Sequence, residues 1–172
     1  LVGVFSDEEK KAGDGVSVGA VKKFLASLGK ESHVSGKSDK LFFSFIPEMP
    51  SKGLFVAGLG KRKKFSANTL RRLGAALFAR ANELGFSSVR LELDSLAAGS
   101  VKLPVAATAL VEGIRLKEYR FDHYKTKPKD KKSDPLKEIV LTVRKSGALT
   151  AVEKEIDTAE EILLAANFTR QL

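Results

Sequence analysis

The apolar residues of this chain follow two spacings, and each spacing predicts one kind of element. Short apolar runs bounded by glycine, proline and serine are typical of buried strands. Apolar residues three or four positions apart predict amphipathic helices. By the first rule, strands are expected at residues 1–5, 41–46, 54–57, 89–93 and 139–143.

Four segments have the helical spacing, at residues 21–29, 66–85, 104–114 and 157–168. Gly29 and Gly85 are expected to end the first two, because glycine adopts the left-handed conformation that closes many helices. Pro104 suits the start of the third. Asp157 or Thr158 is expected to cap the last. Its apolar face is expected to hold Ile162, Leu163, Ala166 and Phe168.

The order of these elements is strand, helix, strand, strand, helix, strand, helix, strand, helix. Such alternation predicts the α/β class, because parallel strands need crossover connections and helices supply them. We expect three layers, with a mostly parallel or mixed sheet of about five strands flanked by about four helices. Residues 41–46 and 54–57 are expected to be neighbouring strands. The strand at 89–93 alternates apolar and charged residues, which favours a position nearer an edge.

The composition is that of a globular protein. The 172 residues are 43% hydrophobic and 30% charged, which fits one folded domain. There is no cysteine, so neither a disulfide nor a thiolate site is possible, and a cytoplasmic location is expected. No apolar run reaches the roughly 20 residues that cross a bilayer, so no membrane partner is expected. Because the sequence begins on an apolar run at Leu1 rather than at Met, we expect a fragment of a longer protein.

The residues offer little catalytic chemistry. His33 and His123 are the only histidines, and they lack the close spacing of a zinc-binding pair. No serine lies in the glycine-lined turn of a hydrolase nucleophile. The adjacent pairs Glu8-Glu9 and Glu160-Glu161 would diverge by about 100° on a helix, so they are interpreted as solvated residues rather than an acid–base dyad.

Gly58-Leu59-Gly60 follows a predicted strand and precedes a predicted helix. A glycine turn at this place can cradle a phosphate with backbone N–H groups. However, Lys63 stands where the dinucleotide pattern needs a third glycine, and the phosphate-binding loop pattern is not matched either. A tight turn is the simpler interpretation, and nucleotide binding stays open as an alternative.

The formal net charge of +9 is concentrated in two stretches. The second is the lysine-rich segment at 125–132, which is expected to be a surface loop because Pro128 and Pro135 prevent regular structure there. The first stretch, which begins at Lys61, is the candidate contact site for nucleic acid or another anion, since basic residues neutralise phosphates. No aromatic residues are interleaved with it to stack bases, which favours an ordinary solvated surface. The candidate residues are Lys61, Arg62, Lys63, Lys64, Arg71 and Arg72.

Four stretches resemble the amino-terminal domain of the leucyl (cytosol) aminopeptidases: Gly53–Lys61, Leu70–Gly74, Glu112–Lys125 and Ala165–Leu172. The most specific is the pattern Glu-Gly-x-x-Leu-x-x-Tyr-x-Phe-Asp-x-Tyr-Lys at 112–125. The last stretch is similar to the helix that leads into the catalytic domain of that family. The resemblance covers nearly the whole chain.

The resemblance implies that residues 1–172 are one accessory domain similar to the macro fold, without the carboxy-terminal peptidase domain. The parent enzymes are hexamers that use two divalent metals, zinc or manganese, to remove amino-terminal residues from peptides. Their metal ligands and catalytic lysine and arginine lie in the second domain. The resemblance therefore implies no catalytic, cofactor-binding or metal residue in this chain, which alone is not expected to be an enzyme. Its expected partners are its own catalytic domain and other copies in the hexamer, where it would support assembly and active-site access.

Two alternatives from other classes stay open. One is a macro-like module that binds ADP-ribose or a related nucleotide through Gly58-Leu59-Gly60. The other is a module that binds DNA through the basic residues at 61–64.

Overall fold

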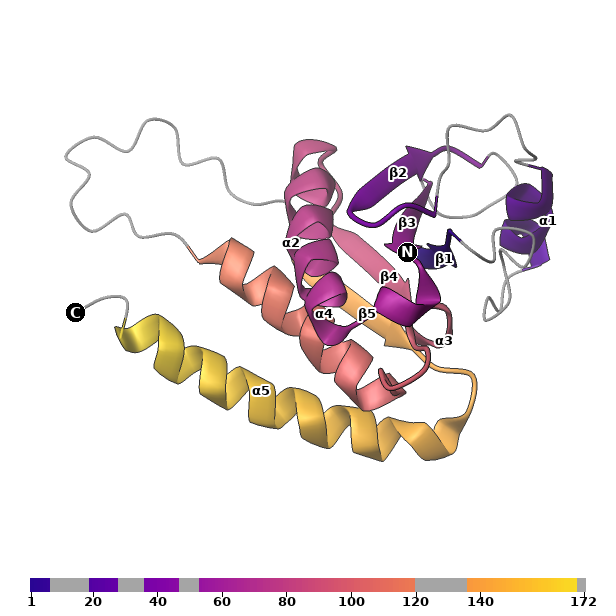
Figure 1. The fold of residues 1–172 in the computed structure, drawn as a ribbon. Coiled ribbons are helices and arrows are strands. Elements are labelled where there is room, and N and C mark those ends of the chain that lie inside the picture. Colours follow the sequence, from indigo (N-terminus) through magenta and orange to yellow (C-terminus); the bar gives the residue numbers. More distant parts are fainter. Residues whose placement is uncertain (7–18, 28–35, 47–52, 120–135, 170–172) are drawn as a thin grey trace, which may run out of the picture.

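The computed structural model describes residues 1–6, 19–27, 36–46, 53–119 and 136–169 (Figure 1). Within these residues, the strands are β1 (Val2–Phe5), β2 (Lys40–Ser44), β3 (Leu54–Gly60), β4 (Ser88–Glu92) and β5 (Glu138–Thr142). The helices are α1 (Gly19–Ser27), α2 (Ala67–Glu83), α3 (Leu93–Leu96), α4 (Leu103–Glu118) and α5 (Leu149–Thr169), with the short 3₁₀ turns η2 (Arg62–Lys64) and η3 (Ser146–Ala148).

The strands form two small sheets that meet at Leu1. In one sheet β3 lies between β1, which is parallel to it, and β2, which is antiparallel; in the other β4 and β5 are parallel. The Leu1 amine donates to the Arg90 carbonyl, and the Leu1 carbonyl accepts from the Glu92 N–H at 3.2 Å. These two bonds have the pattern of a parallel pair between β1 and β4. The strands thus follow the spatial order β2-β3-β1-β4-β5, and the prediction of a mixed, mostly parallel arrangement is confirmed.

The strands β1 and β3 bury side chains on both faces. Val2 and Val56 belong to an apolar cluster that also contains Val21 and Leu25 of α1. Phe55, one position along β3, belongs to a larger cluster formed with the buried faces of α2 and α4. Because successive strand residues point to opposite faces, the two clusters lie on opposite sides of the sheet. The described part of the chain therefore has three layers, with α1 on one side and α2, α4 and α5 on the other (Figure 1).

The helices α2 and α4 cross at two glycines. A Cβ atom added at Gly113 of α4 would lie closer than 3.0 Å to the Arg71 carbonyl oxygen of α2, and one added at Gly74 would meet the Leu110 carbonyl equally closely. The two backbones are therefore in direct contact. Leu70 and Leu110 beside this crossing are completely buried. α5 packs on the outer side of α4, farther from the sheet (Figure 1).

The boundaries of α2 and α4 agree with the predictions. Ser66 precedes α2 in an extended conformation, as an N-cap residue does, although its side chain makes no capping bond. Gly85 follows α2 with φ +72°, the left-handed conformation that was expected. Pro104 lies in the first turn of α4. For the first helix, Val21 is buried as expected, but Leu28 and Gly29 lie outside the described residues.

The predicted start of the last helix is wrong. α5 begins at Leu149, and Thr158 lies inside it, where its hydroxyl donates to the Lys154 carbonyl at 3.0 Å. A hydroxyl bonded to the carbonyl four residues earlier acts within the helix and does not cap it. Val152 and Ala159 are buried and Ile156 packs against the core. Val152 and Ile156 precede residue 157 and have the helical spacing, so the sequence already contained a signal for the earlier start.

The strand predicted at 89–93 ends one residue early, at Glu92, and belongs to the two-stranded sheet. Leu93 begins the four-residue helix α3, which the sequence pattern did not indicate. The buried Ser95 of α3 accepts a bond from the Gly3 N–H at 3.1 Å and donates to the Glu92 carbonyl at 2.7 Å. This tertiary contact with β1 holds the turn. β4 pairs with β5 on one side, and on the other side Leu1 bonds to Arg90 and Glu92.

Candidate domain-docking site

The basic residues singled out in the sequence lie on η2 and on the second turn of α2. Lys61, Arg62, Lys63 and Lys64 are all exposed. The Arg62 guanidinium lies 4.6 Å from the centroid of the Phe5 ring, a cation–π contact.

The two arginines of α2 form ion pairs. Arg71 pairs with Glu112 of α4, and the Arg72 Nε atom donates to Asp39 at 2.9 Å. The arginines of the candidate anion site therefore make contacts within the protein, while Lys61, Lys63 and Lys64 extend into solvent. No geometry here tests binding of DNA, which stays a prediction.

The Gly58-Leu59-Gly60 segment is not the turn that was expected. All three residues belong to β3, where Gly58 pairs with Val4 of β1 and with Lys40 of β2. The Gly60 N–H donates to the Gly36 carbonyl at 2.7 Å, and the Gly60 carbonyl accepts from the Ser6 N–H at 3.0 Å. Because the Gly60 N–H already has a backbone partner, it is not available to cradle a phosphate.

The described residues contain no group of three His, Cys, Asp or Glu side chains that could hold a metal ion. His33 and His123 lie outside the described residues, as do Glu8 and Glu9. Among the described helices, none is long and apolar enough to cross a membrane.

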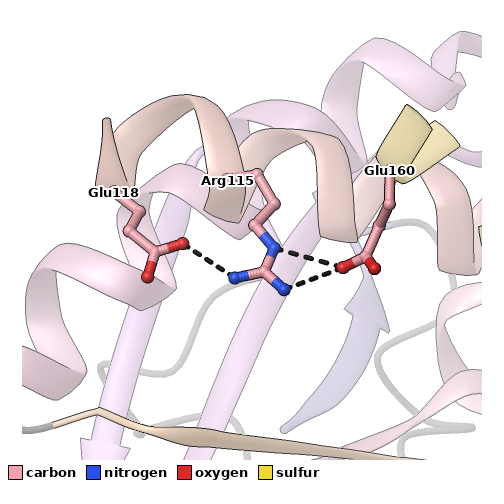
Figure 2. A network of polar contacts seen from close by, with 3 residues as sticks. All are labelled: Arg115, Glu118 and Glu160. Carbon is pink, nitrogen blue, oxygen red and sulfur yellow. Dashed lines mark hydrogen bonds and ion pairs between the residues drawn. The ribbon is translucent and has the colours of Figure 1, made fainter. Parts of the chain in front are cut away.

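A network of three charged residues joins the carboxy-terminal parts of α4 and α5 (Figure 2). Arg115 of α4 donates to Glu118, one turn further along the same helix, at 3.0 Å. It also donates two bonds to one oxygen of Glu160 on α5, from Nη2 at 2.8 Å and from Nε at 3.2 Å. One guanidinium thus connects two helices, which its planar fork of donors allows.

The electrostatics of this network keep Arg115 charged. The hydrogen bonds that Arg115 donates to Glu160 first, and then to Glu118, raise the pKa of Arg115 above its ordinary value. All three side chains are close to half exposed, so the pairs contribute about 1 kcal/mol or less to stability. Glu160 was interpreted as a solvated residue, but it connects two helices. The main contribution of the ion pairs of Arg115 is to fix the direction of α5 relative to α4.

An open depression lies beside this network, between the ends of α4 and α5. Besides the three charged residues, its lining is formed by Tyr119, Leu163, Leu164 and Asn167. Leu163 is buried, whereas Leu164 keeps 72% of its surface exposed. The Oδ1 atom of Asn167 is buried without a hydrogen-bond partner. The depression is therefore open and partly apolar, with charged side chains at its border.

The sequence-based assignment of the α5 apolar face is partly wrong. Leu163 is buried as predicted, but Ile162 and Phe168 are each 63% exposed. Residues 162, 163 and 164 are consecutive and apolar, and each step turns about 100° around a helix, so one face cannot bury all three. This run of three apolar residues, together with Phe168, was the available signal for an exposed apolar surface.

The fold and this surface define a three-layer α/β domain whose last helix presents an apolar end. Residues 1–128 match the model of the cytosol aminopeptidase family, N-terminal domain. The chain belongs to this family, and the resemblance seen in the sequence is confirmed. The expected likeness to macro domains stays a prediction.

The relatives and solved structures agree with this assignment. A probable cytosol aminopeptidase of Rhodopseudomonas palustris (strain BisA53) is 29% identical over 180 residues, a match that covers 100% of this chain and 34% of the relative. The bottromycin maturation enzyme BotP has a similar fold, with TM-score 0.61 and 22% identity over 96% of this chain and 31% of that one. A tomato leucine aminopeptidase mutant gives TM-score 0.59 and 20% identity, covering 84% of this chain and 27% of that one. The chain thus spans about a third of the length of the proteins that it matches.

Proposed function

We propose that this chain is the non-catalytic amino-terminal domain of a leucyl-type, metal-dependent aminopeptidase. The observation that carries the proposal is the match of residues 1–128 to the N-terminal domain of the family, in relatives of which this chain covers only about a third. The longer protein would remove amino-terminal residues from peptides. The carboxy-terminal part would bind the substrate and carry out the hydrolysis.

Hydrolysis assisted by two metals needs a cluster of carboxylate or imidazole ligands around an open site. No such cluster lies within the residues that the structure describes. The two divalent ions, zinc or manganese, would be held by residues of the second domain. The residues of this chain would hold that domain in place rather than take part in the reaction.

The finer roles of this domain are part of the same proposal. It would support assembly of a hexamer and shape access to the active sites of a cytoplasmic enzyme. A rigid three-layer domain suits this role, because α2 and α4 are in direct backbone contact and the Arg115 network connects α4 to α5. Size measurement of the longer protein by light scattering tests this part, and a stable monomer would contradict it.

The main experiment compares the 172-residue chain with the longer protein in hydrolysis of leucine p-nitroanilide, with Mn²⁺ or Zn²⁺ added. Turnover is expected only from the longer protein, and chelation of the metal should abolish it. Circular dichroism of the short chain establishes that it is folded during the assay. Turnover by the folded short chain, or none by the longer protein with either metal, would contradict the proposal.

A further inference from the structure

Near its end, α5 exposes apolar side chains on two different faces of the helix. Leu164 and Phe168 lie one helical turn apart on the same face and form what we name the apolar strip; they are 72% and 63% exposed. Ile162 is 63% exposed but lies about 160° around the helix axis from Leu164. The apolar strip is therefore a candidate contact surface. Ile162 is an exposed apolar residue of the same helix outside this surface and can serve as its control.

The apolar strip is continuous with the depression between α4 and α5. Leu164 lines that depression together with Tyr119 and Asn167, whereas Ile162 does not belong to its lining. The strip therefore borders a concave surface, and Ile162 stands on the opposite side of the helix. Concave apolar surfaces of this kind, with polar groups at the border, are typical of contacts between domains.

The polar groups of the depression indicate what an occupant must supply. Arg115, Glu118 and Glu160 already pair with one another, so the occupant need not carry a charge. The buried Oδ1 atom of Asn167 has no donor in the described structure. A suitable partner surface is therefore mainly apolar.

The path of the chain identifies the occupant. α5 ends at Thr169, three residues before the end of the 172-residue sequence, and the depression lies at that end of the helix. In the relatives, about two thirds of the protein lies outside the part that this chain matches, and the matched model is an N-terminal domain. A following domain would be tethered directly beside the strip. Tethering gives a high effective concentration, so that a small apolar patch is enough for docking.

We propose that the apolar strip and the adjoining depression are the docking surface for the domain that follows residue 172 in the longer protein. This inference rests on the proposed function, since it requires the second domain to be present. A second copy of this chain is the competing occupant, because an exposed apolar patch can also drive self-association.

The test uses cysteine accessibility in the longer protein. Residues 1–172 contain no cysteine, so Leu164→Cys, Phe168→Cys and Ile162→Cys each introduce one defined thiol in this part of the protein. Alkylation by N-ethylmaleimide is followed at each position by peptide mass spectrometry and normalised to the rate in urea. We expect labelling at positions 164 and 168 to be at least ten times slower than at position 162. Equal rates at the three positions would overturn the inference.

Two further measurements identify the occupant. If the protection at 164 and 168 weakens on dilution, a second copy covers the strip and the assignment to the following domain is wrong. Hydroxyl-radical footprinting of the unsubstituted longer protein measures the same three side chains without any change of sequence. It should give lower oxidation of Leu164 and Phe168 than of Ile162, relative to their reactivity in the unfolded chain.

Turnover of leucine p-nitroanilide by the same preparation separates the two proposals. An active enzyme with an unprotected strip would overturn only the docking surface. An inactive protein with a protected strip would overturn the proposed function and leave the docking surface standing.

Discussion

The crossing of α2 and α4 gives the sharpest prediction about stability. For the substitution Gly113→Ala, helix propensity and tertiary packing predict opposite signs for the change in the free energy of unfolding. Gly113 lies inside α4, where alanine is favoured over glycine by about 1 kcal/mol. Local propensity therefore predicts that Gly113→Ala stabilises the protein. The tertiary structure predicts the reverse, since the new Cβ atom would lie closer than 3.0 Å to the carbonyl oxygen of Arg71.

The magnitude follows from what the new methyl group meets. Ordinary van der Waals contact begins at 3.4 Å, so the two helices must separate by more than 1 Å at this contact. Overpacking costs typically about 1–3 kcal/mol, and a backbone carbonyl cannot rotate away as a side chain can. We take the upper end, about 3 kcal/mol, less about 1 kcal/mol of propensity. The net expectation is a loss of about 2 kcal/mol in the free energy of unfolding, which lowers the Tm by about 4–8 °C.

The assay is urea unfolding followed by circular dichroism, with Gly147→Ala as the matched control. Gly147 lies in η3, and a Cβ atom there would have no neighbour within 4 Å, so its substitution should change the free energy of unfolding by less than about 0.5 kcal/mol. If Gly113→Ala is as stable as the control, or more stable than the parent, the close contact of the two helices is wrong.

Three further predictions concern the buried terminus, the core and the network. In a chain that begins at Leu1 with a free amine, burial lowers the pKa of that amine from 8.0 to about 5. The unfolded chain then binds more protons between these pH values, so the free energy of unfolding should rise by about 3 kcal/mol from pH 5 to pH 8, and this rise should be absent when Leu1 is acetylated. Leu110→Ala, at a completely buried position, should cost about 2–5 kcal/mol by urea unfolding, and a cost below about 1 kcal/mol would contradict the core packing. Glu160→Gln should cost less than about 1 kcal/mol, and this small cost should disappear in 1 M salt if it comes from the charge pair with Arg115.

The sequence by itself determined the local elements and the family. Helical spacing and Gly85 located α2 and its end, and Pro104 located the start of α4, because these signals act within one or two turns of the chain. The strand positions followed from short apolar runs between turn residues. The Glu-Gly-x-x-Leu pattern beginning at Glu112 indicated the family without any structure. The structure adds that Gly113 stands where the backbones of α2 and α4 touch, so that a larger residue would meet the Arg71 carbonyl.

The tertiary structure alone decided how these elements meet. Nothing local to β1 placed it between β3 and β4, because strand order depends on hydrogen bonds between residues as distant as Leu1 and Glu92. For the same reason Gly58 and Gly60, which resemble a turn when considered alone, became part of a central strand. The apolar residues near the end of α5 show the same limit. The helical spacing predicted that Leu163 and Phe168 lie on the same apolar face. Only the position of α4 decided that the first is buried and the second exposed.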